Sequence, residues 1–473
     1  MTLKPQHLHP LALIQFSTRT IRDVFLYVVL AVIFGKNQLQ PASWIIIVCA
    51  LIGLAIVVAI LRYWRFTFQI TPTDISINKG LIFRKQLQIP YSRVQTLQVK
   101  QWFYLKPFHL TAVSIETSGH DGDDADASLP VVSQQIVDEL RRLKRASGQL
   151  EQPKQPKIIK NADPTYAINW ADLNTYALTS MGLVPILLGI WALYNKLDDL
   201  VPEHFKSQTI NSLVHLGTLM LVGVLLVGLL LSLVLSYLSI IQRYYHFKLT
   251  LRGHELVTEK GFFQRNTITA AQNRIQAVVL RQTILRQLFR LISVQVLLAS
   301  TAAADEDNDS LVILPVISET NAAVVRHYLP NLPENMPRYN RLTRGGKWRL
   351  IRNAMLEALV LVVPICWFFR PWGLLSLLLF PLAWLFGWYA GRNAGVAWDS
   401  RLLFLQIGKH LHRETYVVEQ SKIQSMSLKE TFWMKSAGFV HVVVNIRQGN
   451  GNAAVEVRYL PIAVGQQLYN WYR

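Results

Sequence analysis

The residues whose types and spacing could do chemistry form a short box that occurs three times, a basic residue followed by Val or Ile and then by Gln. The copies are Arg93-Val94-Gln95, Arg274-Ile275-Gln276 and Lys422-Ile423-Gln424. The cation could bind a phosphate or carboxylate of a partner, with the Gln amide orienting it. The alternative, which we favour, is structural: the cation closes a turn or pairs within the chain, since repeats preserve structure as readily as ligand contacts.

The residues after each box keep the same order in all three copies. Two and four positions after the Gln the chain is apolar, and five positions after it a basic residue follows, namely Lys100, Arg281 or Lys429. Such a shared register indicates one domain built three times. On a regular strand the odd offset places these three cations on the face opposite the apolar positions, so we expect them to face lipid.

Signals for catalysis or metal binding are weak. Two repeats carry an acidic segment, at Asp121 to Asp126 and at Asp305 to Asp309, but neither has the glycine or the distal Glu of an EF-hand loop. The chain has no Walker loop, dinucleotide fingerprint, Gly-x-Ser-x-Gly elbow or HExxH motif. We therefore expect no catalytic residue, no metal site and no cofactor, and we interpret the chain as non-enzymatic.

The composition indicates a membrane protein. Hydrophobic residues make up 51% of the 473 residues and charged residues 16%, and the mean hydropathy is +0.24. Six apolar stretches predict six transmembrane helices in three hairpins. They are residues 21–34, 43–61, 176–194, 213–241, 354–369 and 372–391.

The distribution of charge predicts the orientation. An even number of crossings returns the chain to its starting side, so all three repeats share one face with both termini. The hairpin loops hold only Lys36, Lys196, Lys206 and Arg370 of the 48 Lys and Arg residues, which predicts that the repeats lie on the cytoplasmic side of the membrane. The formal charge of +19 is explained by anionic lipid rather than by nucleic acid, because the cations border the spans and linkers. No cleaved signal peptide is evident.

Two repeats open with aromatic and cationic residues just after a predicted span. These boxes are residues 62–66 and 243–247, in which Arg62, Arg65 and Arg243 are candidate lipid contacts. Rings and cations at this place suit the headgroup region. The same residues also begin an alternating run, so a first strand that continues from the helix is expected as well. The third repeat lacks this box.

Each repeat predicts a small β domain closed by a helix. Alternating apolar residues indicate antiparallel strands, and a Leu-Pro pair then precedes an amphipathic helix. We therefore divide the chain into three hairpins, two linkers and three α+β, mainly β domains, each an antiparallel sandwich or open barrel. The divisions are hairpin 1 and the N-terminal tail at 1–61, domain 1 at 62–147, a linker at 148–175, hairpin 2 at 176–242, domain 2 at 243–330, a linker at 331–353, hairpin 3 at 354–391 and domain 3 at 392–473.

Several strands, one capping helix and a directly attached membrane hairpin resemble the pleckstrin-homology-like (PH-like) domain of bacterial membrane proteins. The whole chain resembles the YdbT-type family, whose members carry several such domains, on the strength of the repeated box, the basic residue after it and the Leu-Pro-helix ending. The resemblance implies a smaller membrane protein of the same family as a partner. The third repeat departs from the pattern, with one extra residue between Gly408 and its box.

These observations favour a docking protein, in which three cytoplasmic modules bind lipid headgroups or a membrane partner. The rival hypothesis is a transporter or lipid-handling protein that works through its six helices. It predicts a polar cavity between helices that contains Ser180, Ser232 or Ser236. A membrane-bound hydrolase would need a nucleophile or carboxylate cluster that the sequence does not show.

Overall fold

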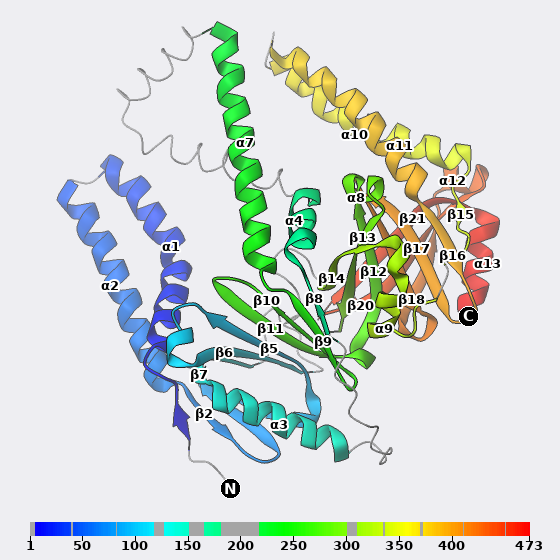
Figure 1. The fold of residues 1–473 in the computed structure, drawn as a ribbon. Helices are drawn as coiled ribbons and strands as arrows, with labels where there is room; N and C mark the ends of the chain where they lie inside the picture. The colour runs from blue at the N-terminus through cyan, green and yellow to red at the C-terminus, as the bar shows by residue number, and fades with distance from the viewer. Residues whose placement is uncertain are drawn as a thin grey trace.

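Figure 1 shows the chain as a computed structural model in which β-rich units follow one another and helices extend from one side of them. The residues that the structure describes are 5–38, 41–81, 83–117, 127–150, 165–180, 217–299, 310–333, 336–368, 372–409, 411–449 and 451–473. The two acidic segments lie entirely outside these residues, as does most of the predicted span 176–194.

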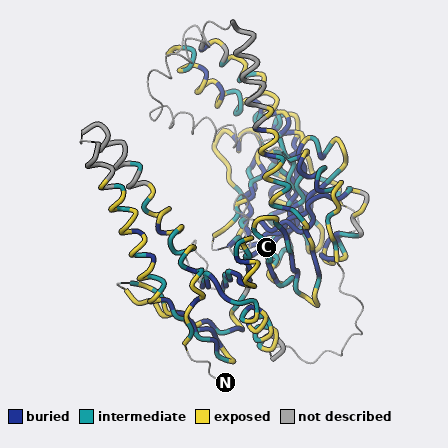
Figure 2. Tube along the Cα trace, turned by 60° about the vertical axis from the view of Figure 1, so that its left-hand side comes forward, coloured by how far each residue is buried: buried dark blue, intermediate teal, exposed yellow. Residues whose placement is uncertain are grey.

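Long helices precede each β-rich unit. They are α1 (Ala12–Gln38) and α2 (Pro41–Arg65), then α4 (Trp170–Thr179) and α7 (Gly217–Tyr244), then α10 (Arg344–Phe368), the 3-10 helix η5 (Trp372–Leu378) and α11 (Leu379–Asn393). Among the described residues, two segments, Val48–Arg65 and Arg344–Phe368, are long and apolar enough to cross a membrane. Only 11% of the first segment and 17% of the second is buried. Figure 2 shows exposed residues along the described parts of α1 and α2. Such apolar surface needs a cover that the described residues do not provide.

The three units repeat one order of six strands and a helix, which confirms the predicted β-rich repeats. In repeat 1 the elements are β2 (Thr67–Ile70), β3 (Asp74–Lys79), β4 (Lys85–Pro90), β5 (Val94–Trp102), β6 (Leu110–Thr117), β7 (Ala127–Ser133) and α3 (Gln134–Leu150). In repeat 2 they are β9 (Lys248–Arg252), β10 (Glu255–Lys260), β11 (Gln264–Ala271), β12 (Ile275–Thr283), α8 (Ile284–Leu288), β13 (Leu291–Leu298), β14 (Leu311–Ser318) and α9 (Ala322–Tyr328). In repeat 3 they are β16 (Gly395–Trp398), β17 (Leu402–Lys409), β18 (His412–Glu419), β19 (Ile423–Lys429), α12 (Phe432–Ser436), β20 (Phe439–Gln448), β21 (Gly451–Pro461) and α13 (Ile462–Tyr472).

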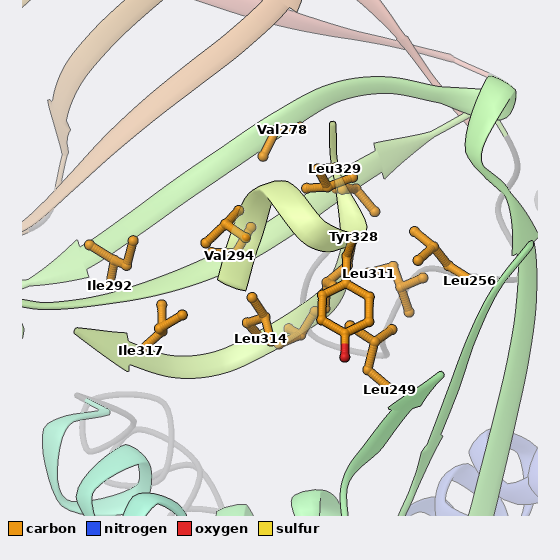
Figure 3. Packing of buried hydrophobic residues seen from close by; sticks show 14 of the residues in the cluster. Leu249, Leu256, Val278, Ile292, Val294, Leu311, Leu314, Ile317, Tyr328 and Leu329 are labelled. Carbon is orange, nitrogen blue, oxygen red and sulfur yellow. The ribbon is translucent and has the colours of Figure 1, made fainter. Parts of the chain in front are cut away.

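Some strands bury alternate residues, whereas β13 and β14 of repeat 2 are buried along almost their whole length. In β2 the buried side chains are Phe68 and Ile70, as the alternation predicts. Figure 3 shows the core of repeat 2, where Leu249 of β9 and Leu256 of β10 lie across from Leu311 and Leu314 of β14, near Tyr328 of α9. Burial of this apolar surface is the main term that stabilises the fold.

The sheets continue from one repeat into the next, which the sequence did not predict. The third strand of repeat 2, β11, pairs antiparallel with the fourth strand of repeat 1, β5, and one seven-stranded sheet results. In the same way β18 of repeat 3 pairs with β12 of repeat 2. We call these two strand pairs the seams. The core of repeat 2 accordingly includes Phe404 and Val417 of repeat 3.

Short strands tie both ends of each helical segment to the same sheet. They are β1 (Gln6–His7), β8 (Thr165–Ala167) and β15 (Asn340–Arg341), and they pair with β2, β9 and β16. The chain therefore leaves a sheet, runs through its helices and returns next to the strand that it left. Residues 165–167 and 340–341 lie within the predicted linkers, so these linkers contain sheet edges.

Candidate membrane-facing site

The antiparallel strands of every repeat have one end beside the helices, which we call the near end, and one far end. In repeat 1, β2 begins two residues after α2, and its Thr67 pairs with Asn78 at the end of β3. The seams carry this polarity along the sheets, since the end of β5 at Trp102 pairs with Gln264 at the start of β11. All three repeats therefore direct their near ends toward the same side, where Figure 1 shows the helices.

Exposed apolar side chains gather in the turns at the near end. The turn after the fourth strand recurs in all three repeats and exposes Phe103 and Phe108 in the first, Leu288 and Phe289 in the second, and Phe432 and Trp433 in the third. The turn after the second strand exposes Phe83 in repeat 1 and Phe262 and Phe263 in repeat 2. We call these nine residues the apolar tips. Large exposed apolar groups that recur at one end of a fold mark a contact surface.

The turn after the fourth strand begins with a threonine cap in repeats 2 and 3, whereas repeat 1 has the 3-10 turn η2 (Lys106–Phe108) without a side-chain cap. Thr283 and Thr431 accept a hydrogen bond from the backbone N–H groups of Arg286 and Met434, which starts a short helix. The turn ends at a residue with positive φ, which is His109, Arg290 or Gly438, fourteen positions after the Gln of each box. Each turn also inserts one buried side chain, namely Leu105, Arg286 or Met434. The anchored turn leaves its remaining apolar side chains exposed.

Arg286 fastens the turn of repeat 2 to the end of α4. Its guanidinium donates hydrogen bonds to the carbonyl oxygen of Tyr176 at 3.3 Å, to Thr179 Oγ1 at 3.0 Å and to Ser180 Oγ at 2.8 Å, and lies 4.4 Å from the centre of the Tyr176 ring. Burial lowers the pKa of Arg286 from its ordinary value. A cation at this place satisfies the last carbonyl groups of a helix.

An aromatic cluster surrounds the end of α7. The N–H group of Phe103 donates to the carbonyl oxygen of Phe263 at 2.8 Å, and that of Phe262 donates to the carbonyl oxygen of Gln242 at 3.0 Å. The rings of Tyr245 and Phe262 lie edge to face with their centres 5.0 Å apart. Gly261, at φ +112°, makes this turn possible, because a Cβ there would lie 2.0 Å from the carbonyl oxygen of Gln264. Tips of two repeats thus meet beside one helix.

Comparison with known proteins identifies the repeated unit. The family model described as bacterial PH domain matches residues 23–147, 209–332 and 356–473. The chain belongs to the bacterial PH domain family. Each match takes in part of the preceding helices as well as the β-rich unit. Over 495 aligned residues the chain is 26% identical to the UPF0699 transmembrane protein YdbT of Bacillus subtilis (strain 168), with 100% of this chain and 99% of that protein covered.

The boxes occupy equivalent places in the three PH domains, at the far end. Arg93, Arg274 and Lys422 each end a 3-10 turn before the fourth strand, and Gln95, Gln276 and Gln424 are the second residues of those strands. Lys422 Nζ donates to the carbonyl oxygen of Asn273 at 3.2 Å, and Gln276 Nε2 donates to that of Arg274 at 3.1 Å. Lys422 thus contacts the neighbouring repeat, and Gln276 bonds to the last residue of its own 3-10 turn, both at the end of the domains away from the helices.

The basic residues five positions after the Gln do not share one environment. Arg281 lies in a seam, with its Nε 3.4 Å from Glu414 Oε1 and its Nη2 3.1 Å from His412 Nε2. Lys100 is opposite Asn266 in the other seam, while Lys429 is exposed on β19. For Lys100 and Arg281 the neighbouring repeat therefore provides the adjacent strand.

The cations after the spans lie near the helices, as their sequence position implies. Arg62 donates to Thr20 Oγ1 at 3.3 Å and lies 3.8 Å from Asp23, both on α1, and Arg65 is exposed. Arg243 is half-buried near the end of α7. Sequence reasoning did not single out the apolar tips, although large apolar residues recur between eight and thirteen positions after the Gln of every box. Among the described residues, no group of three or more His, Cys, Asp or Glu side chains could hold a metal ion.

Proposed function

We propose that this chain is a non-enzymatic multi-pass protein of the bacterial inner membrane whose three cytoplasmic PH domains rest on the bilayer through their apolar tips and serve as docking modules. The observation that carries the proposal is the recurrence of exposed Phe, Trp and Leu side chains at the near end of every PH domain. An exposed cation accompanies them in each turn, as Lys106, Arg290 or Lys435. Apolar side chains with adjacent cations suit the interface of an anionic bilayer.

The six-helix topology belongs to the same proposal. The strands that flank each helical segment are neighbours in one sheet, so each segment crosses the membrane an even number of times if it crosses at all. The near-absence of Lys and Arg from the predicted hairpin loops supports a cytoplasmic position for the domains and for both termini. The B. subtilis relative carries the word transmembrane in its name, which agrees with this assignment.

The transporter hypothesis gains nothing from Ser180. This serine was expected to line a polar path between helices if the chain were a transporter. Its hydroxyl accepts a hydrogen bond from Arg286, so it takes part in the contact between α4 and the second PH domain. The other two serines of that hypothesis, Ser232 and Ser236, are buried on α7, so the transporter alternative rests on them. We retain docking as the proposed function because the exposed tips recur in every PH domain, with lipid and a smaller membrane protein of the PH-like family as candidate partners.

Removal of one tip from each PH domain tests the lipid contact. Phe103, Leu288 and Phe432 are 61%, 73% and 80% exposed, so Phe103→Ser, Leu288→Ser and Phe432→Ser together leave the cores intact. Full burial of such a side chain contributes about 1.5–3 kcal/mol. In vesicles containing phosphatidylglycerol, we expect endoproteinase Glu-C, whose cleavage sites are changed neither by this variant nor by its control, to cleave the PH domains of the triple variant roughly ten times faster than those of the wild type.

The matched control is the triple variant Arg93→Ser, Arg274→Ser and Lys422→Ser at the far end, which should be cleaved at the wild-type rate. The same comparison in detergent should show no difference between the tip variant and the wild type. Faster cleavage of the box variant with an unchanged tip variant would transfer the lipid contact to the boxes and refute the proposal.

A further inference from the structure

The two seams have the same register, counted from the boxes. The residue after Gln95, Thr96, pairs with Ala270, and the residue after Gln276, Ala277, pairs with Val418. At the near end Trp102 pairs with Gln264 and Thr283 pairs with His412, each seven positions after the Gln. A seam is therefore a defined junction between the fourth strand of one PH domain and the third strand of the next.

The three PH domains joined by the two seams form a row, and one third strand and one fourth strand take part in no seam among the described residues. β4 is the third strand of the first PH domain and β19 is the fourth strand of the third, and among the described residues no strand pairs with the outer edge of either. Burial reflects this difference. The first three residues after the Gln are all buried in β5 and β12, whereas in β19 Ser425 is exposed and Ser427 is half-buried. The backbone groups of these edges can accept a further strand.

Charge distinguishes the internal seams from a junction between two copies of the chain. Five positions after the Gln, Arg281 faces Glu414 with 3.4 Å between them, and Lys100 faces Asn266. If β19 of one copy met β4 of another in this register, Lys429 would lie opposite Lys85. Like charges directly opposite each other destabilise a strand pair, so this position disfavours self-joining.

We infer that β19 is a docking edge for the third strand of a PH domain on a different protein, and that this strand carries a carboxylate opposite Lys429 as Glu414 does opposite Arg281. Lys85 keeps the β4 edge of a second copy from taking that place. The inference rests on the proposed docking role and specifies its chemistry. The competing explanation is that the two lysines only prevent unwanted pairing of exposed edge strands. In that case a carboxylate at position 85 would not create a junction.

Charge reversal of the full-length chain supplies the probe, because the β4 edge of a Lys85→Glu variant is a PH third strand with the required carboxylate. Lys85 and Lys429 are both exposed, so neither core is disturbed. We expect purified Lys85→Glu in detergent to self-associate roughly three- to tenfold more tightly than the wild type in analytical ultracentrifugation, with the difference reduced at high salt. Lys429→Glu should associate likewise, and the double variant should return to the wild-type value.

A cysteine pair locates the junction. In the Lys85→Glu background with Cys49 and Cys366 replaced by Ala, Gln86→Cys and Leu428→Cys should form a disulfide between chains, since the seam register places these residues opposite each other. The mismatched pair Gln86→Cys and Ser425→Cys should not. Equal association of all four charge variants, or a disulfide in the mismatched pair alone, would overturn the inference. Wild-type association as tight as that of Lys85→Glu would make a second copy the occupant and would also refute it. Because lipid is absent, the result does not depend on bilayer contact by the tips.

Discussion

Arg286 attaches the second PH domain to the end of helix α4. The equivalent residues are Leu105 and Met434, so the fold accepts an apolar side chain here, yet repeat 2 uses a buried guanidinium that binds the end of α4. Replacement by Met would keep the packing but leave the carbonyl oxygen of Tyr176 and the hydroxyl groups of Thr179 and Ser180 without this donor. A buried polar group left without its partner costs about 1–3 kcal/mol.

We therefore expect Arg286→Met to speed hydrogen exchange of residues 170–179 by roughly tenfold or more, measured by mass spectrometry. Arg274→Met, an exposed arginine at the far end of the same domain, is the matched control and should leave this exchange unchanged. Unchanged exchange in both variants would mean that Arg286 does not hold α4.

For single residues, the sequence predicted which positions of the three repeats are equivalent better than it predicted which side chains touch. The offsets of the boxes correctly indicated that Gln95, Gln276 and Gln424 occupy matching strands. They did not indicate which end of those strands lies beside the helices, because strand alternation specifies a face and not an end. The partner of Arg281 was also hidden, since Glu414 lies 133 positions away in a different repeat, and only the sheet register brings the two side chains together.

Among the elements, the turn after the fourth strand depends on a left-handed residue. Gly438 has φ +74°, and an added Cβ would meet nothing within 4 Å, so only backbone strain opposes substitution there. Gly438→Val should cost about 1–2 kcal/mol, whereas Gly438→Asn should cost much less because Asn tolerates this conformation.

Exchange of the β20 amides (Phe439–Gln448) checks this prediction. It should rise about tenfold in Gly438→Val and stay near the wild-type rate in Gly438→Asn. Equal rates in the two variants would show that the left-handed turn does not limit the stability of this strand. The repeats at His109 and Arg290 already hold larger residues in the same conformation, which indicates that the surrounding fold specifies the turn.

The strands within each repeat could be predicted from alternation, but the strands that join the repeats could not. β8 and β15 have three and two residues, too few for a period, and they lie in stretches whose composition is typical of a linker. The seams rest on backbone hydrogen bonds, which leave no pattern in the side chains of β5 and β11. For the same reason the sequence suggested three separate domains where the structure has sheets that run across their boundaries.

For the molecule as a whole, the shared sheets make the near ends of all three PH domains point in the same direction. Because β11 continues the sheet of β5 and β18 continues that of β12, a near end cannot be reversed in one domain without breaking a seam. In the proposed function the three apolar surfaces on these joined sheets act together, so each contact with the bilayer can be weak. The docking edge at β19 lies at the end of this row of domains, where a further domain could extend it with the same polarity.

At this scale the described residues support two of the six predicted spans. Two described segments pass the test of length and apolar character, and residues 181–216, which include most of one predicted span, lie outside the described part of the chain. The paired strands on either side of each helical segment nevertheless give the hairpin interpretation a structural basis that does not depend on hydropathy.

The accessibility of single cysteines to a membrane-impermeant maleimide tests the central claim most directly, namely that the tips meet the inner face of the membrane and the boxes do not. Cys49 and Cys366 are replaced by Ala, and Asn37→Cys, Phe432→Cys or Ser421→Cys is introduced to mark a hairpin turn, a tip or the far end. In intact cells we expect labelling at 37 alone. In inside-out vesicles position 421 should react quickly and position 432 slowly, with 432 becoming reactive in detergent. Equal, fast labelling of 421 and 432 in inside-out vesicles, or labelling of 421 in intact cells, would contradict the account.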